Sequence, residues 1–258
     1  MRPKISPSIN TPIGSGFFIT GTDTEIGKTL VAGALILKLS ALGYRVAGFK
    51  PVVAGTYRNT HGDLVNEDLE TLQLASNLAF DQNLICPYIL DIPAAPHLIA
   101  KAYGKTLELK SITDSYHLLK KTTDQIIVEG TGGFLVPLNP IHNFGDVAKA
   151  INLPIILVVG MRLGCINHAL LTVESILNRQ LSIAGWIANT LDDKMTFLTE
   201  NIQSLQERIA APFCGLIPKL STHLQKPDNA PYSKAALQFA ANAINLSLLK
   251  TDYPPIKT

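Results

Sequence analysis

The sequence has few charged residues, few cysteines and no long apolar run. Charged residues make up 16% of its 258 residues, with 22 basic and 20 acidic side chains and no block of one sign. This pattern argues against a nucleic-acid groove and against a polybasic membrane patch. The apolar run at 153–161 is too short to span a bilayer. Hydrophobic residues nevertheless make up 47%, which is typical of a folded domain and excludes disorder as the main state.

The cysteine content argues against a disulfide framework. Cys86, Cys165 and Cys214 are odd in number, lie far apart and match no zinc-binding spacing. This use of cysteine suits a reducing cytosol, so we expect a cytoplasmic protein. Residues 1–15 are polar and contain proline, without the apolar segment of a secretory signal, and we expect them to form a loose extension.

Short apolar runs alternate with helix-periodic stretches along the chain. The apolar runs predict strands at 17–20, 44–49, 125–129, 154–160, 183–189 and 213–217. The periodic stretches predict helices at 28–42, 67–78, 111–122, 146–151, 167–178, 196–209 and 233–249. This alternation predicts one doubly wound α/β domain over 16–250, with a mostly parallel sheet and helices on both faces. We expect a proline-containing tail at 251–258.

A phosphate-binding loop follows the first predicted strand. Residues 21–29 read GTDTEIGKT, a G-x5-G-K-T pattern with one more residue between the glycines than is usual. Backbone N–H groups and the helix N-terminus would face the phosphates, Lys28 would add a positive charge, and Thr29 would offer its hydroxyl to Mg²⁺. The alternative is a glycine-rich turn with an incidental lysine. The strand before the loop and the helix after it favour a P-loop NTPase fold.

Two further signals follow the next strands. Lys50 comes directly after the strand at 44–49, and Glu129 ends the strand at 125–129 ahead of Gly130 and Gly132. The carboxyl ends of parallel strands share one crevice, so Lys50 would point toward the same phosphates as Lys28. Alone, Lys50 would be interpreted as a solvated loop lysine. For Glu129 a magnesium carboxylate is already favoured, and an exposed residue of a glycine-rich turn is the alternative. Beside a phosphate loop, Glu129 is expected to be a magnesium carboxylate.

Asp68 and Cys165 remain open on the pattern alone. Asp68 lies at an expected helix start, where capping or compensation of the helix dipole is the default role and metal binding the alternative. A nucleophilic Cys165 is disfavoured because no base is paired with it in the sequence. A small packing residue at a subunit contact is the preferred interpretation.

Five motifs together resemble the dethiobiotin synthetase family, ATP-dependent enzymes that close the ureido ring in biotin synthesis. The motifs are GTDTEIGKT at 21–29, GFKPV at 48–52, VEGTGG at 128–133, LGCINH at 163–168 and GWIAN at 185–189. The resemblance extends from about residue 17 to about residue 220 and thus covers most of the chain. It implies an ATP-dependent carboxylation and ring closure of 7,8-diaminopelargonic acid with CO₂, through a carbamate and a carbamic–phosphoric anhydride.

The resemblance also implies a role for each matching residue. Lys50, Lys28 and Thr24 would be catalytic, while Thr29, Asp68 and Glu129 would bind Mg²⁺. Asn189 would recognise the adenine. The implied ATP-binding residues are Glu25, Ile26, Gly27, Lys28, Thr29, Leu30, Asp68, Glu129, Gly130, Thr131, Gly132, Asn189, Thr190, Pro218, Lys219 and Leu220.

A homodimer with its substrate site at the subunit interface is likewise implied. The expected substrate-binding residues are Thr24, Lys50, Ala54, Gly164, Cys165 and Asn167. Ala54 departs from the family, which often has a serine there, so that hydroxyl contact is lost or replaced.

Three alternatives remain. A partitioning-type nucleotide-switch ATPase shares this fold, but such proteins typically carry an extra lysine early in the loop, and 22–26 contain none. Another ATP-dependent amide-forming synthetase of cofactor metabolism would share the loop and the acid but should lack the motif at 163–168. An inactive nucleotide-binding scaffold is the third.

Overall fold

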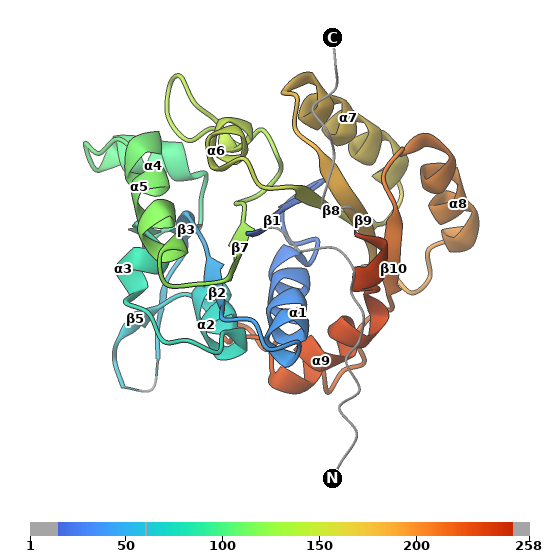
Figure 1. Cartoon of the computed structure of the whole chain (residues 1–258), viewed down its shortest axis with the longest axis horizontal. Helices are drawn as coiled ribbons and strands as arrows, with labels where there is room; N and C mark the ends of the chain where they lie inside the picture. Colours follow the sequence, from blue (N-terminus) through green and yellow to red (C-terminus); the bar gives the residue numbers. More distant parts are fainter. Residues whose placement is uncertain (1–14, 60, 250–258) are drawn as a thin grey trace.

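The central feature of the protein is a six-stranded sheet in which every pairing is parallel (Figure 1). A computed structural model describes residues 15–59 and 61–249, so the expectations for 251–258 and for nearly all of 1–15 lie outside the described residues. The strand order is β10-β9-β8-β1-β7-β2. The strands are β1 (Gly16–Gly21), β2 (Val46–Phe49), β7 (Gln125–Glu129), β8 (Ile155–Met161), β9 (Ile183–Thr190) and β10 (Phe213–Ile217). The predicted doubly wound α/β fold is confirmed.

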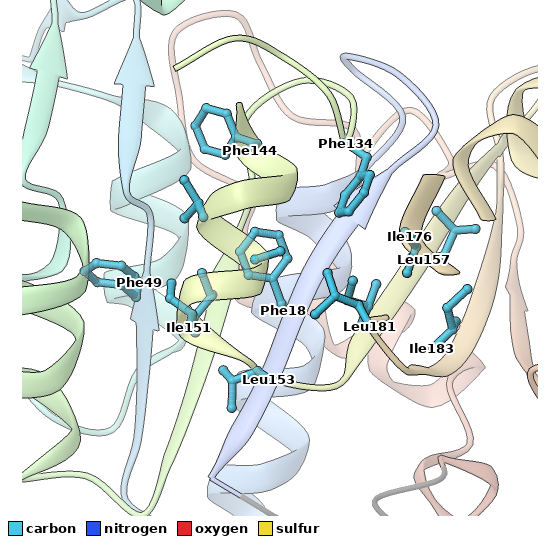
Figure 2. Close-up of a cluster of buried hydrophobic side chains, with 14 of the residues drawn as sticks. Phe18, Phe49, Phe134, Phe144, Ile151, Leu153, Leu157, Ile176, Leu181 and Ile183 are labelled. Carbon is cyan, nitrogen blue, oxygen red and sulfur yellow. The ribbon is translucent and has the colours of Figure 1, made fainter. Parts of the chain in front are cut away.

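Helices cover both faces of this sheet. The helices are α1 (Lys28–Ala41), α2 (Glu67–Ala75), α3 (Gln82–Ile85), α4 (Pro96–Ala102), α5 (Leu109–Lys120), α6 (Phe144–Ile151), α7 (Cys165–Asn178), α8 (Leu198–Arg208) and α9 (Lys234–Ala243). Phe17 and Ile19 of β1 pack toward α1, α2 and α9, whereas Phe18 packs toward α5, α6 and α7. Figure 2 shows Phe18 within the buried hydrophobic cluster on the side of the sheet that faces α5, α6 and α7. A strand buried on both faces explains why β1 reads as a continuous apolar run.

Two small strand pairs were not predicted. β3 (Val52–Ala54) pairs in parallel with β6 (Tyr88–Leu90), and β4 (Tyr57–Arg58) pairs in antiparallel fashion with β5 (Leu64–Val65). Both pairs, together with α3 and α4, lie in the connection from β2 to α5. Strands of two or three residues are too short to give a recognisable alternation.

Two predicted helices end three or more residues earlier than expected. The helix expected over 233–249 ends at Ala243, because Ile244 is extended and Asn245 instead caps a 3₁₀ turn, η1 (Leu246–Leu248). The helix expected over 67–78 ends at Ala75, because Ser76 is extended. The Ser76 hydroxyl lies 2.8 Å from the Leu72 carbonyl oxygen and 3.2 Å from the Gly48 nitrogen, which fixes this end against β2.

Within the described ranges, no helix combines the length and the apolar composition that a bilayer crossing requires.

Candidate active site

The loop between β1 and α1 has the backbone conformation of a phosphate cradle. Glu25 and Gly27 have positive φ angles of 57° and 91°, and Gly27 caps α1 without a side-chain hydrogen bond. A Cβ atom on Gly27 would lie 2.3 Å from the Asn189 amide nitrogen, so any larger residue there would have to displace the Asn189 side chain. The Lys28 ammonium donates to the Asp23 carbonyl oxygen at 2.6 Å. The first turn of α1 therefore leaves its N–H groups available to an anion.

Four predicted residues from four elements meet beside this loop. The Lys50 Nζ atom, just past β2, lies 2.8 Å from Asp68 Oδ2 and 2.6 Å from Glu129 Oε1. The Thr29 hydroxyl oxygen lies 2.8 Å from Asp68 Oδ1 and 2.7 Å from Glu129 Oε1. The Lys50 side chain is 3% exposed and that of Glu129 is 0% exposed. The structure thus brings together a lysine, a hydroxyl and two carboxylates, as the sequence predicts.

The N-cap of α2 explains why Asp68 is available to this cluster. The Asn66 side chain accepts from the backbone N–H groups of Asp68 and Leu69 at 3.0 and 3.2 Å. Because Asn66 performs the capping, the Asp68 carboxylate is left for Lys50 and Thr29. The capping role expected for Asp68 is therefore wrong, although Asp68 does lie in the acidic first turn of α2.

The charges in this cluster control one another. Burial acts to lower the pKa of Lys50, but the Asp68 and Glu129 carboxylates outweigh it and raise that pKa. Burial raises the pKa of Glu129, and Lys50 offsets this only in part. Burial acts to raise the pKa of Asp68, but the Lys50 charge outweighs burial and lowers that pKa. Burial, with Lys50 nearby, lowers the pKa of Lys28 to about 8, so a bound phosphate would restore favourable surroundings to the Lys28 ammonium.

The same oxygens fit a magnesium ion. Thr29 has one hydroxyl proton but two carboxylates within hydrogen-bond distance, and the buried Glu129 Oε2 atom has no hydrogen-bond partner among the described residues. Across 15–59 and 61–249, no group of three or more His, Cys, Asp or Glu side chains is arranged to hold a metal. Mg²⁺ characteristically binds one or two carboxylates together with substrate phosphates, so the donor set is suitable.

A cavity of about 560 Å³ lies beyond the β9 end of the loop. Four predicted residues line it, and the lining continues into residues that the sequence analysis did not single out. The predicted lining residues are Thr190, Pro218, Lys219 and Leu220, and the additional ones are Asp193, Leu198, Leu216, Ser221, Thr222 and Gln225. Within the described chain the buried Thr190 hydroxyl has no hydrogen-bond partner. The Asn189 side chain donates to the Ile26 carbonyl oxygen at 2.9 Å, which joins this cavity to the phosphate loop.

The expected substrate residues lie around the loop but not within the Lys50 cluster. Thr24 is exposed in the loop, and Ala54 ends β3. At the start of α7, Gly164 has a φ of 93° and Asn167 is exposed, whereas Cys165 is 1% exposed and packs in the core. In the described residues no hydrogen bond joins these side chains to Lys50.

The sequence analysis gave Asp23 no role, although this residue organises the loop. The Asp23 carboxylate accepts from the Thr24 N–H at 2.8 Å and forms an ion pair with Arg162, which follows β8. The position of Asp23 inside the motif was a possible signal. No signal in the sequence indicated the pairing with Arg162, because the two residues are far apart in the chain.

The fold and this site define the class of the protein as a P-loop nucleotide-binding protein. The family model described as "AAA domain" matches residues 15–226. The chain is 46% identical over 209 residues to the ATP-dependent dethiobiotin synthetase BioD of Ralstonia nicotianae, covering 81% of this chain and 91% of that protein. The chain belongs to the dethiobiotin synthetase family, within the proteins that the AAA-domain model describes.

The chain also matches solved structures at low sequence identity. A ParA family ATPase from Chlorobium tepidum TLS matches with a TM-score of 0.50 and 17% identity, over 80% of this chain and 86% of that chain. The signal recognition particle receptor FtsY from Elizabethkingia anophelis matches with a TM-score of 0.44 and 12% identity. That match covers 90% of this chain and 66% of the receptor chain, so this chain spans just under two thirds of the receptor's length.

Proposed function

We propose that this protein converts 7,8-diaminopelargonic acid, CO₂ and ATP into dethiobiotin, ADP and phosphate. The observation that carries the proposal is the Lys50 ammonium, held by Asp68 and Glu129 beside a phosphate loop. The relative named as an ATP-dependent dethiobiotin synthetase supports the same activity at 46% identity. Its name also supports ATP as the nucleotide.

The chemistry requires several anions to approach one another. A carbamate and the γ-phosphoryl group are both negatively charged and repel, so the protein must neutralise charge and fix orientation rather than supply a nucleophile. Lys28 and Lys50 provide two ammonium groups for this purpose, and burial strengthens their effect. Mg²⁺, when bound by Thr29, Asp68, Glu129 and the phosphates, supplies further charge neutralisation.

The proposed reaction has three steps. One amine of the substrate adds to CO₂ and loses a proton, which gives a carbamate. A carbamate oxygen then attacks the γ-phosphorus in line, the bond to ADP breaks, and a carbamic–phosphoric anhydride forms. Finally the second amine attacks the carbamate carbon, phosphate leaves with the bonding electron pair, a proton is lost, and the five-membered urea closes. Lys50 would hold the carbamate and the transferring phosphoryl group together.

The cavity next to β9 suits the nucleoside of ATP. Its volume of about 560 Å³ is within the range of small-molecule sites. The unpartnered Thr190 hydroxyl and the Lys219 and Gln225 side chains offer polar contacts to a base or ribose. We therefore assign the adenosine to this cavity and the triphosphate to the loop, with Asn189 at their junction.

A second copy of the chain would complete the diamine site. The N-terminal turn of α7 suits a carboxylate through its amide groups, and Asn167 is exposed there. The neighbouring Leu163 side chain is 98% exposed, and the second copy would cover it in the proposed dimer. Because Cys165 is buried, we assign it a packing role. A cytoplasmic location is consistent with three free, buried cysteines.

The proposal is tested by incubating the protein with diamine, bicarbonate and MgATP and detecting dethiobiotin by mass spectrometry. We expect dethiobiotin to accumulate together with ADP, and expect Lys50→Ala to lower turnover on the order of 10²-fold or more, as for the loss of one preorganised donor. ATP hydrolysis without dethiobiotin would reject the synthetase activity. Near-normal turnover by Lys50→Ala would reject the role of Lys50.

A further inference from the structure

A segment at 218–232 connects the nucleoside cavity to the start of α2. We call it the strap. Its first part lines the cavity with Pro218, Lys219 and Gln225. A turn closes this part, because the Gln225 N–H donates to the Ser221 carbonyl oxygen at 3.1 Å and the Gln225 side chain donates to the Leu220 carbonyl oxygen at 3.0 Å. The conformation of the cavity wall is thus fixed up to Gln225.

The strap is fastened to α2 immediately after this turn. Lys226 forms an ion pair with Glu67, the first residue of α2, and its Nζ atom lies 6.0 Å from the centre of the Tyr232 ring. The Tyr232 N–H donates to the Thr71 hydroxyl at 3.0 Å. That hydroxyl donates in turn to the Glu67 carbonyl oxygen at 2.7 Å. Two successive parts of the strap therefore hold the first turns of α2.

The start of α2 also carries a carboxylate of the Lys50 cluster. Asp68 follows Glu67 directly and contacts Lys50 and Thr29. The side chains of Lys226 and Glu67 are 22% and 33% exposed, so solvent screens this pair less than a fully exposed pair. A change of strap position at Lys226 would therefore reach Asp68 through one peptide unit.

We propose that Lys226 and Glu67 are positioning residues that couple occupancy of the nucleoside cavity to the placement of Asp68 for magnesium. The inference rests on the proposed function in so far as ATP and Mg²⁺ are taken as the ligands. Gln225 senses the nucleoside, Lys226 holds Glu67, and Asp68 meets the ion. Neither Lys226 nor Glu67 contacts the reacting atoms.

The test measures ADP binding by titration calorimetry with and without Mg²⁺, in the parent and in Lys226→Met and Glu67→Gln. The coupling is the ADP dissociation constant without Mg²⁺ divided by the constant with Mg²⁺. In each variant we expect this ratio to fall on the order of fivefold, with little change in the ADP affinity measured without Mg²⁺. Because the two residues act as one pair, the double variant should lose no more than either single variant. Lys226→Arg, which keeps the ion pair, should retain the parent ratio.

A matched control uses the exposed Lys110–Asp114 pair of α5, whose atoms lie 2.5 Å apart. Lys110→Met removes the same charge from the molecule and should leave the ratio unchanged. Equal ratios in Lys226→Met and the parent would overturn the inference, and so would equal weakening with and without Mg²⁺.

The two proposals fail separately. If the parent protein makes dethiobiotin and Lys226→Met keeps the parent ratio, only the coupling is refuted. If the parent protein makes no dethiobiotin but the ratio falls in Lys226→Met, the synthetase activity is refuted and the coupling is supported.

Discussion

Lys50 is the residue on which both the stability and the proposed chemistry of the site depend. Its ammonium is the cation that contacts both carboxylates of the cluster among the described side chains. Without it, Asp68 and the fully buried Glu129 would face each other uncompensated. A buried charge that has lost its partner is strongly destabilising.

Lys50→Met should therefore destabilise the nucleotide-free protein by about 3–5 kcal/mol, the usual cost of breaking a buried pair. Urea unfolding followed by circular dichroism measures this change. The double variant Lys50→Met/Glu129→Gln removes the orphaned charge and should regain part of the stability while remaining inactive. A single variant as stable as the parent protein would contradict this charge balance.

Gly27 tests the conformation of the loop. Gly27→Ala places a Cβ atom 2.3 Å from the Asn189 amide nitrogen at a φ of 91°, so it should displace Asn189 and weaken ADP binding more than about tenfold. Gly43→Ala is the matched control, because Gly43 has a φ of 94° with nothing within 4 Å of its Cβ position. Both variants should lose roughly 1 kcal/mol for the left-handed backbone, but Gly43→Ala should bind ADP normally. Similar ADP affinities for the two variants would refute the clash.

At the scale of elements, the helix ends are fixed by side chains that the chain supplies locally. In α6, Asn143 and Asp146 form a capping box: the Asn143 side chain accepts from the Gly145 N–H at 2.9 Å, and Asp146 accepts from the Asn143 N–H at 2.8 Å. No residue at the start of α6 was assigned to ligand binding. It therefore offers a change in stability without a change in chemistry.

Asn143→Ala should lower the free energy of unfolding by about 1 kcal/mol, because the first N–H groups of α6 lose their acceptor. Lys149→Ala, an exposed change on the same helix, should stay within about 0.5 kcal/mol of the parent. Chemical denaturation curves of both variants provide the comparison. The interpretation of the cap fails if the two variants unfold at the same denaturant concentration.

The elements that the sequence predicts are those with enough residues to establish a period. The six strands of the central sheet and the longer helices carry such patterns, whereas β3, β4, β5 and β6 have two or three residues each. Helix ends were missed where a side chain intervenes, as Ser76 does for α2. Lys50, Thr29 and Glu129 were predictable because each stands at a strand end or in a motif. Asp68 lies at a helix start outside the motifs, so only the family resemblance assigned it to this cluster. The Lys226–Glu67 pair was not, because it joins segments that lie far apart in the sequence.

At the scale of the whole molecule, the core keeps its thiols unreactive. All three cysteines are free and buried. Burial raises the pKa of Cys214 to about 11 and that of Cys86 to about 12, and it also raises the pKa of Cys165. The reactive thiolate is therefore scarce near neutral pH.

Labelling with a disulfide reagent at pH 8 should be slow for all three cysteines in the folded protein and complete in denaturant. Because the pKa of Cys214 lies above the working range, its rate should rise about tenfold per pH unit from pH 7 to 9.5, instead of levelling off near an ordinary thiol pKa. Rapid labelling of any cysteine in the native state would contradict this account of the core.

The central claim is that an oxygen of the carboxylated amine attacks the terminal phosphoryl group of ATP. The most direct measurement supplies ¹⁸O-labelled CO₂ with the diamine and MgATP in unlabelled water and analyses the phosphate after a short reaction. Our account predicts phosphate carrying an ¹⁸O atom that came from CO₂, formed in step with dethiobiotin. Phosphate that contains no ¹⁸O, formed while the CO₂ still carries its label, would contradict it.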